Sequence, residues 1–221
     1  MKNSENILFD LDGTLTDSRP GIINSILYSL NRLGIKEPYP AELYSFLGPS
    51  LKESFQNRYQ LPESVALLAV EYYQEYYSVK GILENEIYPG ITDLLDYLTT
   101  DATRRLFVAT SKPEVLAKSM IRHFKFDQYF TDAIGSNMNN TRTDKGEIIA
   151  YLLASYELDP RDTIMIGDRK HDIIGARKNG IRSIAVQYGY GAALELTDAG
   201  PDYFAKDPAA LKRLFSTGNV Y

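Results

Sequence analysis

The chain contains no cysteine, and none of its apolar runs is long enough to span a bilayer. The absence of cysteine excludes disulfides, thiol nucleophiles and zinc sites built on sulfur, and it fits a reducing compartment. Residues 1–6 carry no apolar core of a signal peptide. We therefore expect a cytoplasmic protein with no membrane partner.

An excess of positive charge is also missing. The 24 Lys and Arg residues are outnumbered by 29 Asp and Glu residues, and the net charge of -5 offers no basic field for a nucleic-acid backbone. The 221 residues allow one large domain or two small ones, and an apolar share of 44% is enough for a buried core. We expect a globular protein without a nucleic-acid partner, either a monomer or a homodimer.

The most informative stretch is a short apolar run, residues 7–9, that leads into Asp10-Leu11-Asp12-Gly13-Thr14. This pattern is typical of the carboxyl end of a buried strand, which is where open α/β sheets bind ligands. Two carboxylates this close repel each other, so both stay ionised only if a cation or a shared proton compensates them. We therefore expect a divalent metal ion to compensate the two carboxylates.

A calcium-binding loop or a solvated turn could also produce such an acidic stretch. An EF-hand calcium loop does not fit, because it needs Gly at its sixth position and Glu at its twelfth. Here Gly13 is the fourth residue and Gly21 is the twelfth. A solvated acidic turn after a strand stays open from this stretch alone, since Asp and Gly are common in turns.

Two patterns of apolar residues divide the chain. Between about residues 19 and 88 the spacing is helical throughout, over 22–33, 41–47, 51–59 and 63–79. Elsewhere helices and strands alternate. The expected helices are 91–99, 113–124, 145–156, 171–179 and 208–215, and the expected strands are 105–109, 163–166 and 183–186, with short segments near 133 and at 203–204. This alternation predicts an α/β fold with a doubly wound parallel sheet, and the helical block predicts an inserted lid domain.

Hydroxyls and a lysine occur where helices begin. Thr110-Ser111-Lys112 follow the apolar run 106–109, and such an end can bind phosphate, although a helix cap is the commoner role of Ser and Thr. Lys145 lies in the first turn of an expected helix, where its charge opposes the helix dipole unless an anion faces it. Both stretches leave a binding role and a local structural role open.

A further acidic strand end follows residues 163–166. Asp168 comes directly after Gly167, and Asp172 follows four residues later at a helix start, so that both can face one cleft. A capped loop would explain the pair by itself. Carboxylates that share a cleft would suit a divalent metal ion.

These stretches together resemble the four motifs of the haloacid dehalogenase-like (HAD) phosphatase superfamily, and residues 10–14 resemble the first motif. The resemblance implies a Rossmann-like core in which Asp10 is a nucleophile that forms an aspartyl phosphate. Asp12 would be the acid/base, and Lys145 would pair with the nucleophile and the phosphoryl group. The implied Mg²⁺ ligands are Asp10, Asp168 and the backbone carbonyl of Asp12, with Asp172 holding the metal's water shell.

The resemblance also implies how the phosphate is bound. Thr110 matches the phosphate-binding hydroxyl of the second motif, Ser111 supplies a backbone donor at most, and the amides around Leu11 supply further donors. Lys112 could add charge near the leaving group. Residues 139–142, Asn-Asn-Thr-Arg, depart from the Asp-Gly-Thr-Arg of close relatives, but Asn140 tolerates the left-handed backbone that Gly would adopt.

Four shorter sequence stretches resemble those of phosphoglycolate phosphatase-like proteins. The matching stretches are Asp17-Ser18, Phe46-Leu47-Gly48-Pro49, Tyr88-Pro89-Gly90 and Gly167-Asp168-Arg169-Lys170-His171-Asp172. This resemblance implies a catalytic core of residues 1–17 and 89–221, and a helical cap of residues 18–88 that closes over the substrate and supplies specificity. Gly48, Ser50 and Lys52 are the candidate cap residues, although the start of a helix explains them equally well.

The activity implied is Mg²⁺-dependent hydrolysis of a small phosphorylated metabolite, with 2-phosphoglycolate as the first choice. Similar relatives are 5'-nucleotidases, pyrophosphatases or broad sugar-phosphate phosphatases, and β-phosphoglucomutases share the four motifs. A non-catalytic phosphate-binding regulator is a further alternative, against which the complete motif set argues. The tyrosine-rich stretch 71–77 fits cap packing better than a nucleobase platform, and neither His123 nor His171 is assigned a role.

Overall fold

The computed structural model describes residues 5–47, 50–137 and 141–216. A six-stranded sheet in the order β5-β4-β1-β6-β7-β8 forms the centre of one of its two units, and every adjacent pair of strands is parallel. The strands are β1 (Asn6–Phe9), β4 (Arg105–Pro113), β5 (Asp132–Ser136), β6 (Thr163–Gly167), β7 (Arg182–Val186) and β8 (Tyr203–Ala205). The α/β fold predicted from the sequence is confirmed.

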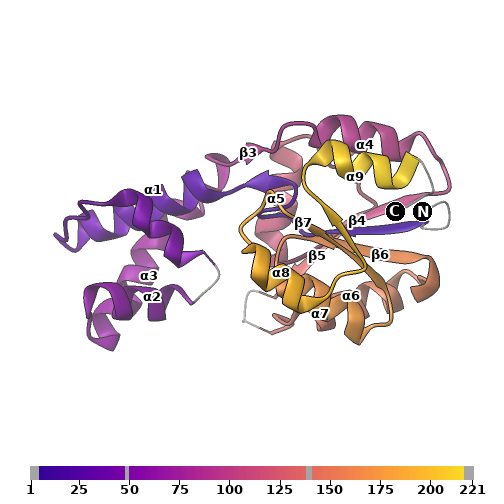
Figure 1. Cartoon of the computed structure of the whole chain (residues 1–221). Helices are drawn as coiled ribbons and strands as arrows, with labels where there is room; N and C mark the ends of the chain where they lie inside the picture. The colour runs from indigo at the N-terminus through magenta and orange to yellow at the C-terminus, as the bar shows by residue number, and fades with distance from the viewer. Residues whose placement is uncertain (1–4, 48–49, 138–140, 217–221) are drawn as a thin grey trace. The chain divides into compact units, whose positions relative to one another are not determined.

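The strand order places β1 at the point where the chain changes direction. From β1 the chain adds β4 and β5 on one side and then returns to add β6, β7 and β8 on the other. Side chains of β1 are all buried, since helices cover both faces of the sheet (Figure 1). In such sheets a ligand site is expected beyond the carboxyl ends of the strands, beside this switch point.

Six α-helices of this unit lie between the strands or after the last strand in the part of the chain that the structure describes. They are α4 (Ile91–Thr99), α5 (Glu114–His123), α6 (Lys145–Ser155), α7 (Lys170–Lys178), α8 (Ala193–Ala199) and α9 (Pro208–Ser216), with a short 3₁₀ turn at Pro160–Asp162. In Figure 1, α4 and α9 lie together on one side of the sheet, and α6 and α7 lie on the other. Helix α8 is absent from the sequence prediction, because its seven residues bury only Leu196 and Ala199.

Strand β4 differs from its prediction in length and regularity. It continues to Pro113 instead of ending at Ala109, and its register with β5 shifts between these two residues. The irregular stretch is the one that carries Thr110, Ser111 and Lys112. The sequence pattern ended the strand early because these residues are polar, whereas the backbone stays extended through them.

The second compact unit comprises Ser18–Glu86, and the first comprises Met1–Asp17 with Ile87–Tyr221. The second unit contains α1 (Arg19–Arg32), α2 (Leu51–Tyr59) and α3 (Glu63–Tyr77), with 3₁₀ helices at Pro40–Phe46 and Gly81–Leu83. Two short strands, β2 (Thr16–Asp17) and β3 (Glu86–Ile87), form a two-stranded sheet. The stretch 40–46 winds as a 3₁₀ helix where an ordinary helical spacing was expected.

The helical unit has a core of its own. The Ser29 hydroxyl on α1 donates to the Ala69 carbonyl on α3 at 2.7 Å, which fixes the two longest helices against each other. Two residues of the tyrosine-rich stretch, Tyr73 and Tyr77, are buried and stack with ring centroids 5.3 Å apart. Among the described residues, no helix combines the length and the apolar character needed to cross a membrane.

Candidate active site

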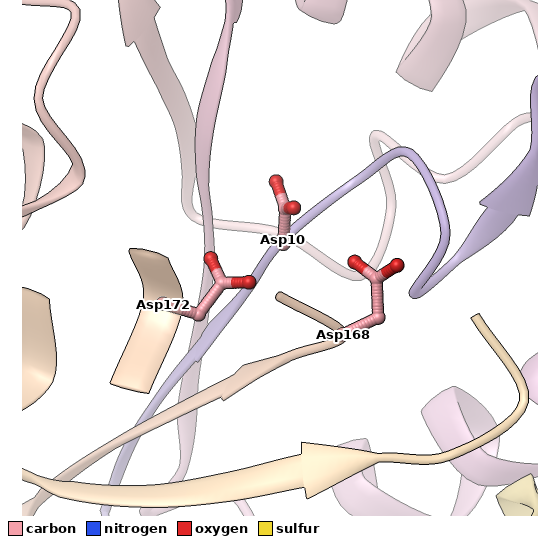
Figure 2. A group of neighbouring side chains, drawn as sticks. All are labelled: Asp10, Asp168 and Asp172. Carbon is pink, nitrogen blue, oxygen red and sulfur yellow. The ribbon is translucent and has the colours of Figure 1, made fainter. Parts of the chain in front are cut away.

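Three carboxylates converge at the carboxyl end of the parallel sheet. Asp10 follows β1, Asp168 follows β6, and Asp172 lies in the first turn of α7. Their ligand oxygens all lie within 4.8 Å of one another, and all three residues are buried (Figure 2). The parallel topology causes this convergence, because adjacent strands β1 and β6 end at the same edge of the sheet.

Gly13 allows the turn after β1 to approach Asp168. Its backbone has φ of 86°, which favours glycine, and a Cβ at this position would overlap the Asp168 carboxyl group. The Gly13 amide donates to the Thr16 carbonyl at 2.8 Å, and the amides of Leu15 and Thr16 donate to the Leu11 carbonyl. These hydrogen bonds close the turn, and its Gly13 packs against Asp168 at the end of β6.

Lys145 lies between two of the three carboxylates. Its Nζ is 2.8 Å from Asp10 Oδ1 and 2.8 Å from Asp172 Oδ1, and it donates to the Ala109 carbonyl at 2.8 Å. The Asp144 carboxylate caps the helix by accepting hydrogen bonds from the next two amides after Lys145. The dipole penalty that the sequence suggested is offset by two anions opposite the ammonium group.

Burial raises the pKa values of two carboxyl groups in the cluster. Desolvation raises the pKa of Asp10 to about 6, against the opposing effect of Lys145, with Asp172 adding to the rise. Desolvation, helped by the charges of Asp10 and Asp172, raises the pKa of Asp168 to about 8. Desolvation opposes a charged Lys145, but the two carboxylates that it contacts outweigh this effect and raise its pKa.

One ammonium group thus faces three buried carboxyl groups, and the ionised cluster would keep two uncompensated negative charges. A divalent cation would balance them. The donor set is entirely carboxylate oxygen, which suits a hard cation such as Mg²⁺ or Ca²⁺ better than a thiol-preferring or imidazole-preferring metal. The residues present therefore fit the type of metal that the sequence predicted.

The Asp12 side chain lies outside this cluster. Its Oδ2 accepts from Lys112 Nζ at 2.7 Å, while its Oδ1 is buried and has no hydrogen-bond partner among the described residues. Only 7% of the Lys112 side chain is exposed. The pairing gives Lys112 a defined place beside the predicted acid/base.

The predicted phosphate-binding residues surround the same strand ends. Thr110 is buried, and its Oγ1 accepts from the Lys112 amide at 3.3 Å. The Ser111 hydroxyl donates to the Thr143 carbonyl at 3.4 Å, so it is engaged locally. The Leu11 backbone amide directly follows the predicted nucleophile and opposes the burial-driven rise in the pKa of Asp10.

The predicted cap residues belong to the helical unit. Gly48 lies outside the described residues, and Ser50 is an exposed residue directly before α2. Lys52, on α2, pairs with Glu63 of α3 at 3.0 Å. Their suggested role in specificity stays a prediction.

Several residues at the site carried no recognised signal in the sequence. The Tyr190 amide donates to Asp168 Oδ2 at 2.6 Å. Gly189 lies so close to Asp168 that a Cβ there would overlap it. The alternation of Tyr and Gly over residues 188–191, directly after a strand, was the available clue.

Comparisons with known proteins agree with these observations. The model of the family described as haloacid dehalogenase-like hydrolase matches residues 7–186. A protein named 5'-nucleotidase from Pseudomonas aeruginosa is 45% identical over 212 residues, which are 96% of this chain and 96% of that protein. A protein named phosphoglycolate phosphatase from Vibrio vulnificus is 24% identical over 213 residues, 93% of each chain.

A solved structure is similar over the same extent. It is that of a candidate phosphatase from Clostridium difficile, with a TM-score of 0.93 and 45% sequence identity. The match covers 97% of this chain and 100% of that one. The likeness therefore includes both compact units and not the sheet alone.

Proposed function

Since this chain belongs to the haloacid dehalogenase-like hydrolase family and is a phosphatase, we propose that it is a Mg²⁺-dependent phosphomonoesterase that acts through an aspartyl phosphate on Asp10. The observation that carries the proposal is the buried cluster of Asp10, Asp168 and Asp172 with Lys145 paired to two of its members. Asp10, Asp168 and the Asp12 carbonyl would hold the metal, with Asp172 orienting its water.

Asp10 is the nucleophile of the first step. One of its carboxylate oxygens attacks phosphorus while the bond between phosphorus and the leaving oxygen breaks, and Asp12 gives its proton to that oxygen. Lys145, which contacts the Asp10 carboxylate at 2.8 Å, holds that group in place. Mg²⁺, when bound, supplies positive charge against the carboxylates and the phosphoryl oxygens.

Asp12 acts as the base of the second step. It takes a proton from a water molecule that attacks the phosphorus of the aspartyl phosphate, and Asp10 returns as a free carboxylate while phosphate leaves. The buried oxygen of Asp12 that lacks a hydrogen-bond partner is the acceptor we assign to this proton. Thr110 and the Leu11 amide would bind the phosphoryl oxygens.

For the substrate, we place nucleoside 5'-monophosphates first and 2-phosphoglycolate second, which reverses the order that the sequence motifs suggested. The reason is the strength of the likeness, because the 5'-nucleotidase of P. aeruginosa is similar over nearly the whole chain at almost twice the identity of the phosphoglycolate phosphatase. We assign the choice between them to residues 18–88 as a cap, since the catalytic carboxylates are common to both reactions. The substrate class is a small phosphorylated metabolite in either case.

The test is kcat/KM for phosphate release from a panel of purine and pyrimidine 5'-monophosphates, 2-phosphoglycolate, pyrophosphate and hexose phosphates, with Mg²⁺ and with EDTA. Asp10→Asn should abolish turnover and leave the fold intact, while Asp198→Asn, an exposed carboxylate on α8, should match wild type. Turnover of Asp10→Asn within about tenfold of wild type would contradict the nucleophile, whose loss removes the covalent route. Full activity in EDTA would contradict the metal requirement.

A further inference from the structure

The segment after β7 packs directly onto the end of β6. We refer to residues 188–195 as the β7–α8 segment. Its Tyr190 amide donates to Asp168 Oδ2 at 2.6 Å, a shorter hydrogen bond than the 3.5 Å one that the same carboxylate accepts from the Thr14 hydroxyl. A Cβ at Gly189 would overlap Asp168, and a Cβ at Gly191 would overlap the Asp168 carbonyl. Backbone therefore packs on backbone around Asp168.

The same segment contacts the turn that follows β1. The Tyr188 hydroxyl donates to the Thr14 carbonyl at 2.9 Å, and the Tyr188 ring packs edge-to-face against Tyr88 at a centroid distance of 5.0 Å. The Tyr190 hydroxyl donates to Asp17 Oδ1 at 3.3 Å. One short segment thus contacts both loops that carry the catalytic carboxylates.

Glu195, in the first turn of α8, reaches the two residues that follow Asp168. Its Oε1 accepts from Arg169 Nε at 2.8 Å and from the Lys170 amide at 3.0 Å, and its Oε2 accepts from Arg169 Nη2 at 3.3 Å. The Arg169 amide in turn donates to Asp172 Oδ2 at 3.0 Å. Residues 169–171 are the link between Asp168 and Asp172, so their position determines how far apart those two carboxylates lie.

We propose that Glu195 is a positioning residue of the metal site, which holds the Asp168–Asp172 turn through Arg169 and the Lys170 amide and thereby sets the affinity for the divalent cation. The proposal rests on the proposed function, because it needs a metal at this cluster. Glu195 itself is no ligand. Residues that orient metal ligands typically change metal affinity by 10-fold to 100-fold when they are lost, although they never touch the ion.

The experiment is calorimetric titration of the full chain with Mg²⁺ alone, without substrate. Glu195→Gln keeps the shape of the side chain and removes its charge, and it should weaken Mg²⁺ binding by about tenfold. Asp198→Asn removes an exposed charge from the same helix and should leave the affinity within about twofold of wild type, as expected for a screened surface charge. At saturating Mg²⁺ the kcat of Glu195→Gln should approach that of wild type.

A second variant, Arg169→Lys, keeps the positive charge but cannot contact both oxygens of Glu195 as the guanidinium does. It should weaken Mg²⁺ binding in the same direction, and the double variant should lose less than the sum of the two single losses. Unchanged Mg²⁺ affinity in the folded variants, with only a lower melting temperature, would overturn the positioning role. A wild-type protein that binds no Mg²⁺ would instead overturn the proposed metal site.

Discussion

The raised pKa of Asp168 predicts that the metal-free protein loses stability as the pH rises from 6 to 8. Folded Asp168 has a pKa of about 8, whereas the unfolded carboxyl is already ionised at pH 6, so the folded state binds more protons over this range. Stability falls with pH wherever the folded state binds more protons. A carboxyl group with this pKa lowers the free energy of unfolding by about 2 kcal/mol between pH 6 and pH 8.

Thermal unfolding in EDTA at pH 6, 7 and 8 measures this effect. For a chain of this size about 2 kcal/mol corresponds to a fall in Tm of roughly 4–8 °C. Saturating Mg²⁺ should remove the pH dependence and raise Tm, because a bound cation keeps the carboxylates ionised and binds only the folded chain. Asp10, with a pKa of about 6, adds a smaller loss in the same direction, mostly near the lower end of the range.

Asp168→Asn is the matched control. His171 contributes in the opposite direction, because its pKa is lowered by burial and by neighbouring cations, so its contribution to stability increases as the unfolded histidine loses its proton. The variant keeps His171 and removes only the carboxylate, and the difference between wild type and variant therefore isolates Asp168. If wild type and Asp168→Asn show the same pH dependence in EDTA, the reasoning about the buried carboxylates is wrong.

Three further predictions concern single residues. Lys145→Met removes the ammonium group from the buried cluster and should lower the free energy of unfolding by roughly 3–5 kcal/mol, measured with urea at pH 8 in EDTA. The loss should be smaller at pH 6, because protonation of the carboxyl groups removes part of their repulsion. Equal losses at both pH values would contradict this. Asp12→Asn should lower kcat by about 10²–10⁴ for alkyl phosphates and by less for p-nitrophenyl phosphate, whose leaving group needs no proton; equal losses would exclude an acid role. Gly13→Ala should weaken Mg²⁺ binding and lower Tm more than Gly180→Ala does, because both have positive φ but only Gly13 lies against Asp168.

The part of the site that the sequence predicted depends on local patterns. A run of apolar residues that ends in Asp can be recognised without knowledge of the fold, and alternation of strands with helices then implies that Asp10 and Asp168 meet at one edge. The sequence marks Lys145 because a lysine is unfavourable at a helix start unless an anion faces it. Each of these signals lies within a few residues of the group concerned.

The remaining part depends on contacts between distant segments. Glu195 pairs with Arg169 across 26 positions, and Tyr190 donates to Asp168 across 22. Neither residue acts as a metal ligand itself, since Tyr190 acts through its backbone amide and Glu195 through Arg169. Helix α8, which carries Glu195, is too short to show a helical period.

These contacts between distant segments hold the buried carboxylates close together despite their mutual repulsion. Buried carboxyl groups with raised pKa values oppose folding at neutral pH, so the metal-free site is a source of instability. A bound cation removes the repulsion among these carboxylates, so the uncompensated negative charge favours cation binding. This holds only if the carboxylates cannot move apart to relieve their repulsion without a cation. The backbone packing at Gly13 and Gly189 and the ion pair between Glu195 and Arg169 prevent such movement. Residues that never contact the substrate therefore support the metal site, because they keep the carboxylates in positions that favour a bound cation.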